Sequence, residues 1–217
     1  MSTDARRIRL LMALRQAGVT DTTVLSAIER TPRELFVPDA FQDQAWENIA
    51  LPIDLGQTIS QPLIVGLMTQ ALELNPRHLV LEVGTGSGYQ AAILSRLCRR
   101  VFTIERLKPL LAEAEGRFRA LRLDNVTTRH GDGTRGWPEQ APFARVLVTA
   151  AGGADPPKDL TDQLAVGGVM IIPLGGDHRD QKVVRFRRTD SGLTREDLWP
   201  VRFVPLLSDP PQQVRPA

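Results

Sequence analysis

The sequence contains a single cysteine, few aromatic residues and no long apolar run. Cys98 cannot form an internal disulfide and has no chelating neighbours, so we interpret it as a core or near-surface thiol without a role in catalysis. No stretch approaches the ~20 apolar residues of a membrane span. The N-terminal region has no apolar core typical of a signal peptide. A disulfide scaffold and a membrane-spanning chain are therefore excluded, and we expect a cytoplasmic protein with no membrane partner.

A large excess of charge of one sign is also missing. Lys and Arg number 27 and Asp and Glu 25, which gives a net charge of +2. The basic residues are dispersed, with small clusters only at 99–100 and 185–188 and no aromatic platform for stacking bases. The three histidines, His78, His130 and His178, are scattered and form no metal-binding pattern. We expect neither a nucleic-acid partner nor a metal.

The length of 217 residues fits one domain with an ordinary hydrophobic core. We expect this domain to span residues 1–207, with the helices and loop of residues 1–55 covering its core. The proline-containing segment 208–217 is expected to be a flexible tail. We expect the protein to be a monomer.

The stretch from Leu79 to Gln90 organises the rest of the chain. A short apolar run that ends at Val83 has the length and composition of a buried parallel strand, and apolar residues at helical spacing follow it. Between them, Gly84, Gly86 and Gly88 leave space for a sharp turn and for a ligand near the first amides of the helix. The pattern predicts a strand, a glycine turn and a helix that together bind a ligand.

The glycine spacing indicates which ligand. A dinucleotide fingerprint counted from Gly84 requires a third glycine at the position of Tyr89, and one counted from Gly86 reaches only an alanine. An acid, Glu82, followed by glycine at every second position resembles the first motif of S-adenosylmethionine-dependent methyltransferases. Glu105 ends the next apolar run. A carboxylate there can accept hydrogen bonds from the ribose hydroxyls of a dinucleotide or of S-adenosylmethionine, so the glycine spacing is what favours the second.

The remaining periodicity predicts an α/β fold. Asp21 is a natural cap for the second helix, and Gly167 and Gly168 are expected to stop the last one. The predicted helices span 4–17, 21–30, 63–74, 89–97, 107–122 and 160–164. The predicted strands span 79–83, 101–104, 125–128, 145–149 and 169–173, followed by antiparallel strands at 181–188 and 199–206. We expect a Rossmann-like methyltransferase fold with a mostly parallel central sheet flanked by helices, an N-terminal helical extension and antiparallel C-terminal strands.

Two further segments have both a structural and a functional interpretation. In Gly56 to Pro62, Ser60 is a natural N-cap for the next helix, but a cap does not explain the uncharged polar neighbours Gln57, Thr58 and Gln61, which could bind a polar substrate. Asp132 follows the third strand between two glycines. It is either a turn residue or an acceptor for an adenine amino group.

These motifs together resemble the protein-L-isoaspartate O-methyltransferase family. The resemblance runs from 33–38 to 201–206, and its most selective part is the Gln-Thr-Ile-Ser-Gln-Pro run. It implies that Ser60 is the active-site residue and that Gln57 and Thr58 bind substrate with it. The cofactor residues that it implies are Glu82, Gly84, Thr85, Gly86, Gly88, Glu105, Asp132 and Gly133.

The resemblance implies methyl transfer from S-adenosylmethionine to the free α-carboxylate of an L-isoaspartyl residue in a damaged protein or peptide, which starts repair through a succinimide. A carboxylate with a pKa of roughly 3.5 is already ionised at neutral pH, so no general base is needed. Hydroxyl and amide groups suit such an acceptor better than an arginine clamp. An extended peptide is expected to lie against 48–54 and 201–205.

Two alternatives stay open at this point. A methyltransferase of the same fold could act on RNA or a small molecule. A protein that binds the cofactor or an isoaspartyl peptide without turnover could also keep these motifs. The chain departs from the family pattern at Ala144 in place of aspartate, at Asp54 in place of glycine, and in the small loop 152–155. Ala144 and the loop bear on the second alternative, while Asp54 and the loop bear on substrate preference.

Overall fold

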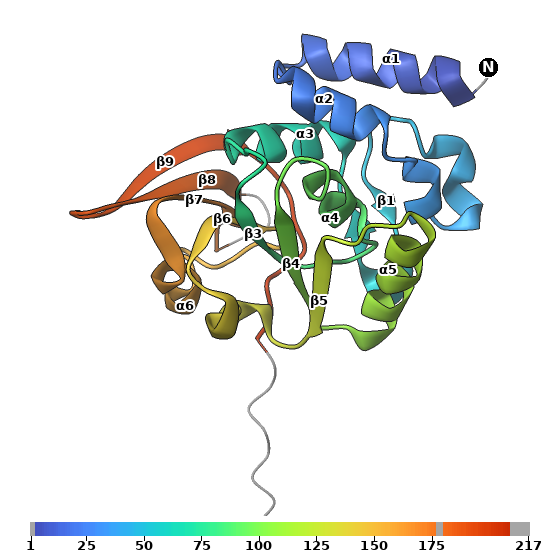
Figure 1. Ribbon diagram of the computed structural model, residues 1–217. Helices are drawn as coiled ribbons and strands as arrows, with labels where there is room; N and C mark the ends of the chain where they lie inside the picture. The colour runs from blue at the N-terminus through green and yellow to red at the C-terminus, as the bar shows by residue number, and fades with distance from the viewer. Residues whose placement is uncertain (1–2, 177–179, 209–217) are drawn as a thin grey trace, which may run out of the picture.

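A computed structural model describes residues 3–176 and 180–208. Within these residues the central sheet contains seven strands in the order β5-β4-β3-β6-β7-β8-β9, with helices packed on it (Figure 1). The sheet strands are β3 (Leu79–Val83), β4 (Arg100–Glu105), β5 (Val126–His130), β6 (Phe143–Val148), β7 (Leu164–Leu174), β8 (Lys182–Thr189) and β9 (Gly192–Pro200). The α-helices are α1 (Thr3–Gln16), α2 (Thr22–Glu29), α3 (Pro62–Ala71), α4 (Tyr89–Leu94), α5 (Lys108–Ala120) and α6 (Lys158–Asp162).

The first part of the sheet, from β5 to β7, is parallel. Strand β3 lies in its middle, between β4 and β6, and its residues 80–83 are buried. Parallel strands with helical crossovers are covered on both faces, which is why β3 reads as a continuous apolar run. The carboxyl ends of β3, β4 and β6 therefore meet at one edge, and the predicted parallel sheet is confirmed.

The last two strands are antiparallel, as predicted, but the final strand lies earlier than expected. β9 occupies Gly192–Pro200, and most of the predicted strand at 199–206 has no strand structure. A tight connection around Ser191 and Gly192, where φ of Gly192 is 135°, returns the chain directly onto β8. Both faces of the first part of β9 are exposed to solvent, so its sequence does not alternate between apolar and polar residues. A prediction based on that alternation therefore placed the strand too late in the chain.

Gly167 and Gly168 do not end a helix. They lie inside β7, which begins at Leu164, and the register with β6 shifts between Phe143 and Arg145. Gly167 has φ of 76°, a conformation that favours glycine. Glycines inside a strand commonly mark such an irregularity, so the prediction of a helix stop was wrong.

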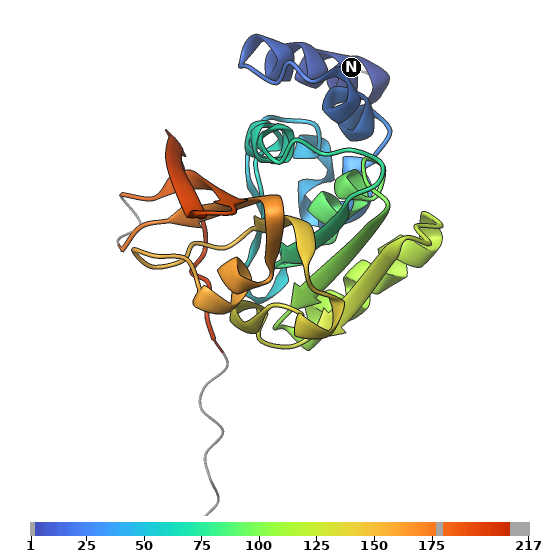
Figure 2. The same cartoon turned by 60° about the vertical axis from the view of Figure 1, so that its left-hand side comes forward.

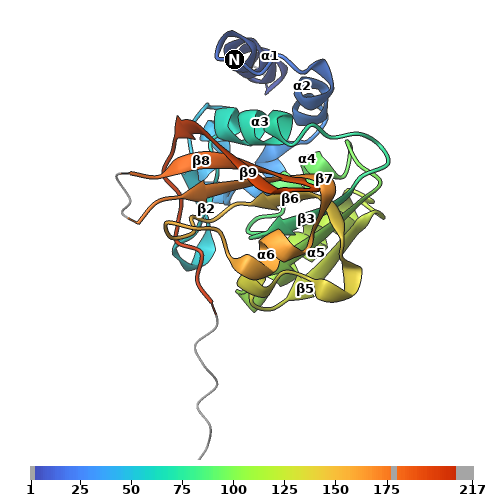
Figure 3. The same ribbon diagram turned by 90° about the vertical axis from the view of Figure 1, so that its left-hand side faces the viewer.

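The two N-terminal helices pack together at one end of the molecule. Figures 2 and 3 show α1 and α2 stacked on α3, on the side away from most of the sheet, and α2 also contacts α4. As predicted, Asp21 caps α2 by accepting hydrogen bonds from the amides of Thr23 and Val24, at 2.8 and 3.2 Å. Between α2 and α3 run the short 3-10 helices η1 (Arg33–Phe36), η2 (Asp39–Gln44) and η3 (Asp54–Gly56) and a hairpin of β1 (Leu51–Pro52) and β2 (Thr58–Ile59).

Among the described residues, no helix has the length and apolar character needed to cross a membrane. The predicted tail lies outside the described residues from position 209 onward, and so does His178. The division into one domain with a covering N-terminal part stays a prediction.

Candidate active site

A cavity lies at the carboxyl ends of β3, β4 and β6. Three segments form most of its boundary: the glycine wall (84–87), the acceptor wall (56–60) and the C-terminal wall (204–207). The other lining residues are Val65, Val83, Tyr89, Gln90, Ile104, Glu105, Arg106, Leu107, Gly133, Thr149 and Ala150. Ligands of open α/β sheets bind outside the carboxyl ends of the strands, so this is the expected location for a ligand site.

The turn of the glycine wall requires glycine at two positions where a side chain would not fit, Gly84 and Gly88, the second of which follows the wall directly. A Cβ atom at Gly84, where φ is 96°, would lie 2.4 Å from Oγ1 of Thr149. That hydroxyl donates hydrogen bonds to the carbonyl oxygens of Val83 and Gly84, at 3.0 and 2.7 Å. Gly88, with φ of 89°, precedes α4, and a Cβ there would lie 2.8 Å from the ring of Phe118. The two glycines allow close packing of the turn against β6 and α5.

Glu105 links the glycine wall to the end of β4. Its Oε2 accepts a hydrogen bond from the amide of Gly86 at 2.8 Å, and its Oε1 accepts one from the amide of Leu107 at 2.9 Å. The side chain also lines the cavity. A carboxylate with two oxygens retains acceptor capacity after two such bonds, so it can also accept from a ligand hydroxyl.

Glu82 does not line the cavity; it lies behind the glycine wall and is fully buried. Burial raises the pKa of Glu82 to about 8. The hydroxyl of Thr103 donates to its Oε2 at 2.5 Å, and the hydroxyls of Thr103 and Thr85 are 2.6 Å apart. Either hydroxyl can be the donor in that second bond. The chain of three side chains holds the glycine wall against β4.

Asp132 is a turn residue in the structure. Its Oδ1 accepts hydrogen bonds from the amide and hydroxyl of Thr134, at 2.8 and 2.7 Å, and so caps the short 3-10 helix η4 (Gly133–Arg135). Gly133 lines the cavity, whereas Asp132 does not. A Cβ at Gly133 would lie 2.4 Å from Cγ1 of Val83. The contact of Asp132 with adenine stays a prediction.

Ser60 is not the cap of α3. Gln61 occupies the capping position without a side-chain hydrogen bond, and the first helical residue is Pro62, which has no amide proton to satisfy. The amide of Leu63 instead donates to Oδ1 of Asn48 at 3.0 Å. Asn48, a loop residue, thus has the capping role that the sequence suggested for Ser60. Ser60 lines the cavity instead.

The acceptor wall is held from behind by residues that sequence reasoning did not identify. Nε2 of Gln61 donates to the carbonyl of Asn48 at 2.9 Å, which gives Gln61 a structural role outside the cavity lining. Nη2 of Arg33 donates to the carbonyl of Ser60 at 2.9 Å. Gln57, Thr58 and Ser60 line the cavity together, and their role in substrate binding stays a prediction. Only the tertiary structure shows that Gln61 faces away from it.

The C-terminal wall follows the last strand. The amide of Ala151 donates to the carbonyl of Val204 at 2.8 Å, and the amide of Leu206 donates to the carbonyl of Ala151 at 2.7 Å. These bonds attach the chain end to the loop that follows β6. Residues 152–155 and Ala144 are not among the cavity residues, although both are departures from the family pattern.

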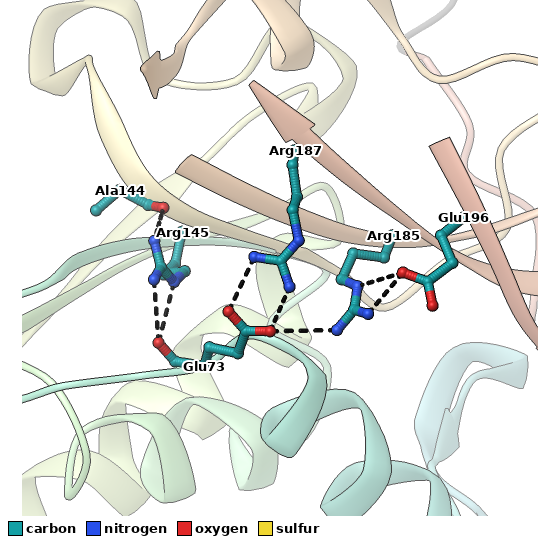
Figure 4. Close-up of polar contacts among 6 residues, drawn as sticks. All are labelled: Glu73, Ala144, Arg145, Arg185, Arg187 and Glu196. Carbon is teal, nitrogen blue, oxygen red and sulfur yellow. Dashed lines mark hydrogen bonds and ion pairs between the residues drawn. The ribbon is translucent and has the colours of Figure 1, made fainter. Parts of the chain in front are cut away.

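The basic cluster at 185–188 is largely neutralised within the molecule. Figure 4 shows Arg185 and Arg187 directed at the carboxylate of Glu73, with hydrogen bonds of 3.3 Å from Nη1 of Arg185 and 2.9 Å from Nη1 of Arg187. Arg185 also donates to Glu196 at 2.6 and 3.0 Å. Arg145 donates to the backbone carbonyl of Glu73 at 3.1 and 3.3 Å. These arginines fasten the end of α3 to the sheet and do not form an open phosphate-binding surface.

The comparisons with known proteins agree on one family. The family model described as Protein-L-isoaspartate(D-aspartate) O-methyltransferase matches residues 5–210. A protein-L-isoaspartate O-methyltransferase of Rhodospirillum centenum is 72% identical over 209 residues, which cover 96% of this chain and 95% of that protein. One of Rhodospirillum rubrum is 63% identical and covers 100% of this chain and 99% of that protein.

Solved structures give the same result. A protein-L-isoaspartate O-methyltransferase structure superposes with a TM-score of 0.82 at 29% identity, over 92% of this chain and 65% of that one. A Plasmodium falciparum structure described as this enzyme in complex with S-adenosyl-L-homocysteine has a TM-score of 0.81 at 24% identity, over 93% of this chain and 98% of that one, which supports the fold. Matches over nearly the full length at high identity leave no ambiguity about descent. The chain belongs to the protein-L-isoaspartate(D-aspartate) O-methyltransferase family.

Proposed function

We propose that this protein methylates the free α-carboxylate of L-isoaspartyl residues in damaged proteins and peptides, with S-adenosylmethionine as methyl donor. The observation that carries the proposal is the arrangement of the cavity. It places the hydroxyl-bearing acceptor wall and the glycine wall, with Glu105, around one space. Family membership supports the same activity.

The cavity residues fit the cofactor. Three glycines with positive φ keep side chains away from the turn, and the orphan amides at the start of α4 lie beside it. Glu105 is at the end of β4, where a carboxylate can accept from the ribose hydroxyls. We propose cofactor roles for Gly84, Thr85, Gly86 and Gly133 in the lining. Glu82, Gly88 and Asp132 are proposed to support them. When bound, S-adenosylmethionine supplies an electrophilic methyl group.

On the acceptor side, the protein's task is to orient a carboxylate that is already charged. Thr58 and Ser60 present hydroxyl donors and Gln57 an amide. Neutral donors fix one carboxylate oxygen without the strong ion pair that would reduce its nucleophilicity. The apolar C-terminal wall, with Leu206 and Leu207, excludes water from the same space. Ser60 is the residue that we assign to acceptor alignment.

Repair follows from the chemistry of the product. The methyl ester carries a better leaving group than the carboxylate, so the neighbouring peptide nitrogen attacks the ester carbonyl and expels methanol. The succinimide that forms opens partly to normal aspartate, and no further side chain of the protein is required. We also propose that the protein acts as a cytoplasmic monomer on peptide acceptors, which bind along 48–54 and 201–205.

The experiment is methyl transfer from labelled S-adenosylmethionine to two synthetic peptides that are identical except for L-isoaspartyl or L-aspartyl at one position. We expect label in the isoaspartyl peptide alone. Equal labelling of both peptides, or of neither while cofactor binding is intact, contradicts the proposed acceptor. Structured RNA tested in parallel is expected to remain unlabelled.

A further inference from the structure

Arg33 is a fully buried arginine without an acidic partner. None of its side-chain surface reaches solvent, and within residues 3–176 and 180–208 no carboxylate lies within salt-bridge distance of it. Burial lowers the pKa of Arg33, but a guanidinium titrates so far above neutrality that it stays charged. Burying an unpaired charge is costly. The fold therefore keeps a charge at this position against a substantial penalty.

The contacts of Arg33 connect it to the acceptor wall. Its Nη2 donates to the carbonyl of Ser60 at 2.9 Å and lies 3.4 Å from the carbonyl of Ile49. Ile49 precedes β1 and Ser60 follows β2, so the guanidinium joins the two open ends of this hairpin. The hairpin has only two residues in each strand and is too short to fix its own ends.

A second contact leads to the cavity boundary. The guanidinium carbon of Arg33 is 4.7 Å from the centre of the Tyr89 ring, and Tyr89 lines the cavity. Phe36 packs against the same ring edge-on, at 5.4 Å between centroids. The positive charge is thus one side chain away from the space where the acceptor carboxylate is expected, without being part of the lining. In addition, Nε and Nη1 of Arg33 have no hydrogen-bond partner among the described residues, which leaves its charge only partly compensated.

We propose that Arg33 is a positioning residue for the acceptor: it sets the backbone of Ser60 and attracts the substrate carboxylate from behind Tyr89 without contacting it. Such a charge favours binding of an anion but makes no ion pair that would stabilise the nucleophile before transfer. This inference rests on the proposed function, because it concerns the same acceptor.

The test uses Arg33→Lys, Arg33→Met and a control, Thr31→Val, in the full-length protein. Lysine keeps the charge but lacks the planar guanidinium that lies over the Tyr89 ring while its Nη2 reaches the carbonyl of Ser60, whereas methionine also loses the charge. Thr31 is equally buried. Its hydroxyl donates to the carbonyl of Ala27 at 2.8 Å and accepts from Nε of Arg96 at 3.0 Å, and neither partner belongs to the acceptor wall. The measurements are KM and kcat with an isoaspartyl peptide, Kd for S-adenosylhomocysteine, and Tm.

For Arg33→Lys we expect KM for the peptide to rise about tenfold, the cost of one hydrogen bond to a charged donor. Arg33→Met is expected to raise it further. Kd for S-adenosylhomocysteine is expected to change by less than about twofold, because the glycine wall does not touch Arg33. Thr31→Val is expected to lower Tm while KM stays at the wild-type value. If the role of Arg33 were purely structural, its variants would show the same pattern.

Three results overturn the proposal. They are a wild-type KM in either folded Arg33 variant, an equal loss of cofactor and peptide affinity, and failure of both Arg33 variants to fold. If only Arg33→Met fails to fold, Arg33→Lys decides. A wild-type protein that does not methylate the isoaspartyl peptide removes the proposed function and this inference together. A wild-type protein that does methylate it, with unchanged KM in Arg33→Lys, removes only the inference.

Discussion

The glycine wall and the acceptor wall of the cavity are built in different ways. The glycine wall is a run of consecutive residues whose turn follows from their own backbone freedom. The acceptor wall is an irregular segment fixed by two side chains from earlier in the chain, Arg33 and Asn48. The difference indicates that glycines of the segment itself shape the backbone turn on the cofactor side, which Glu105 and Thr149 then hold in place. The acceptor wall takes its shape from long-range packing. Four changes can break or sharpen this comparison.

Gly84→Ala should have the largest effect. The new methyl group would lie 2.4 Å from Oγ1 of Thr149, and φ of 96° is unfavourable for alanine. We expect a loss of about 4 kcal/mol of stability from strain and overlap together, and S-adenosylhomocysteine affinity reduced by at least about a hundredfold. The control is Gly153→Ala, since nothing lies within 4 Å of that position. Titration calorimetry measures the affinity for S-adenosylhomocysteine, and chemical denaturation measures the free energy of unfolding. Normal cofactor affinity in Gly84→Ala would show that the wall tolerates side chains.

Glu82→Gln tests the buried support of the glycine wall through Thr103 and Thr85. Burial raises the pKa of Glu82 to about 8 from its ordinary value of 4.5. The folded protein therefore keeps a proton that the unfolded chain releases, so this group's stabilisation is complete below pH 4.5 and is lost as the pH rises to 8. The loss across this range is on the order of 5 kcal/mol for the wild-type protein, and glutamine, which does not titrate, should abolish this pH dependence. Urea unfolding at intervals from pH 5 to 9 gives the free energy of unfolding against pH for the wild-type protein and for Glu82→Gln. Parallel curves for the two proteins would refute the raised pKa of Glu82.

Ser60→Ala examines the acceptor wall directly. We expect kcat/KM for the isoaspartyl peptide to fall about tenfold or more, because one hydrogen bond to an anion is lost. Cofactor affinity and Tm should stay unchanged, since Ser60 does not cap α3. Ser191→Ala, at the distant turn between β8 and β9, is the matched serine control. Methylation by Ser60→Ala at the normal rate would remove the role assigned to this hydroxyl.

Glu73→Gln should have the smallest effect. It weakens the ion pairs with Arg185 and Arg187 that fasten the far end of α3, and these groups are partly exposed. We expect a loss of about 1 kcal/mol, which shrinks as salt is added, and unchanged peptide kinetics. Glu139→Gln, which removes the exposed pair with Arg129, should lose less. A changed KM in Glu73→Gln would mean that the acceptor wall depends on the whole of α3.

Much of the fold could be predicted because its elements carry local signals. The parallel strands are apolar runs, and the cap of α2 by Asp21 follows from a short-range hydrogen bond. The two errors in the sheet occurred where such signals are weak. β9 is exposed along most of its length, and β7 contains glycines that normally indicate a boundary.

The site was predicted unevenly for the same reason. Gln57, Thr58, Ser60 and Glu105 line the cavity, as their motifs indicated. Arg33 and Asn48 were not identified, because nothing near them in the sequence shows what their side chains contact. Gln61 was grouped with the substrate side on composition alone, but its amide group bonds to a loop carbonyl.

The sequence by itself determined the glycine turn, the acid at the end of β4 and the family to which the chain belongs, because these depend on residue types at short spacing. The tertiary structure decided that Glu82 supports the glycine wall from behind, that Asn48 caps α3, and that the charge of Arg33 lies behind Ser60 and Tyr89. Burial and pairing between distant segments arise only when the chain packs, so no local pattern records them.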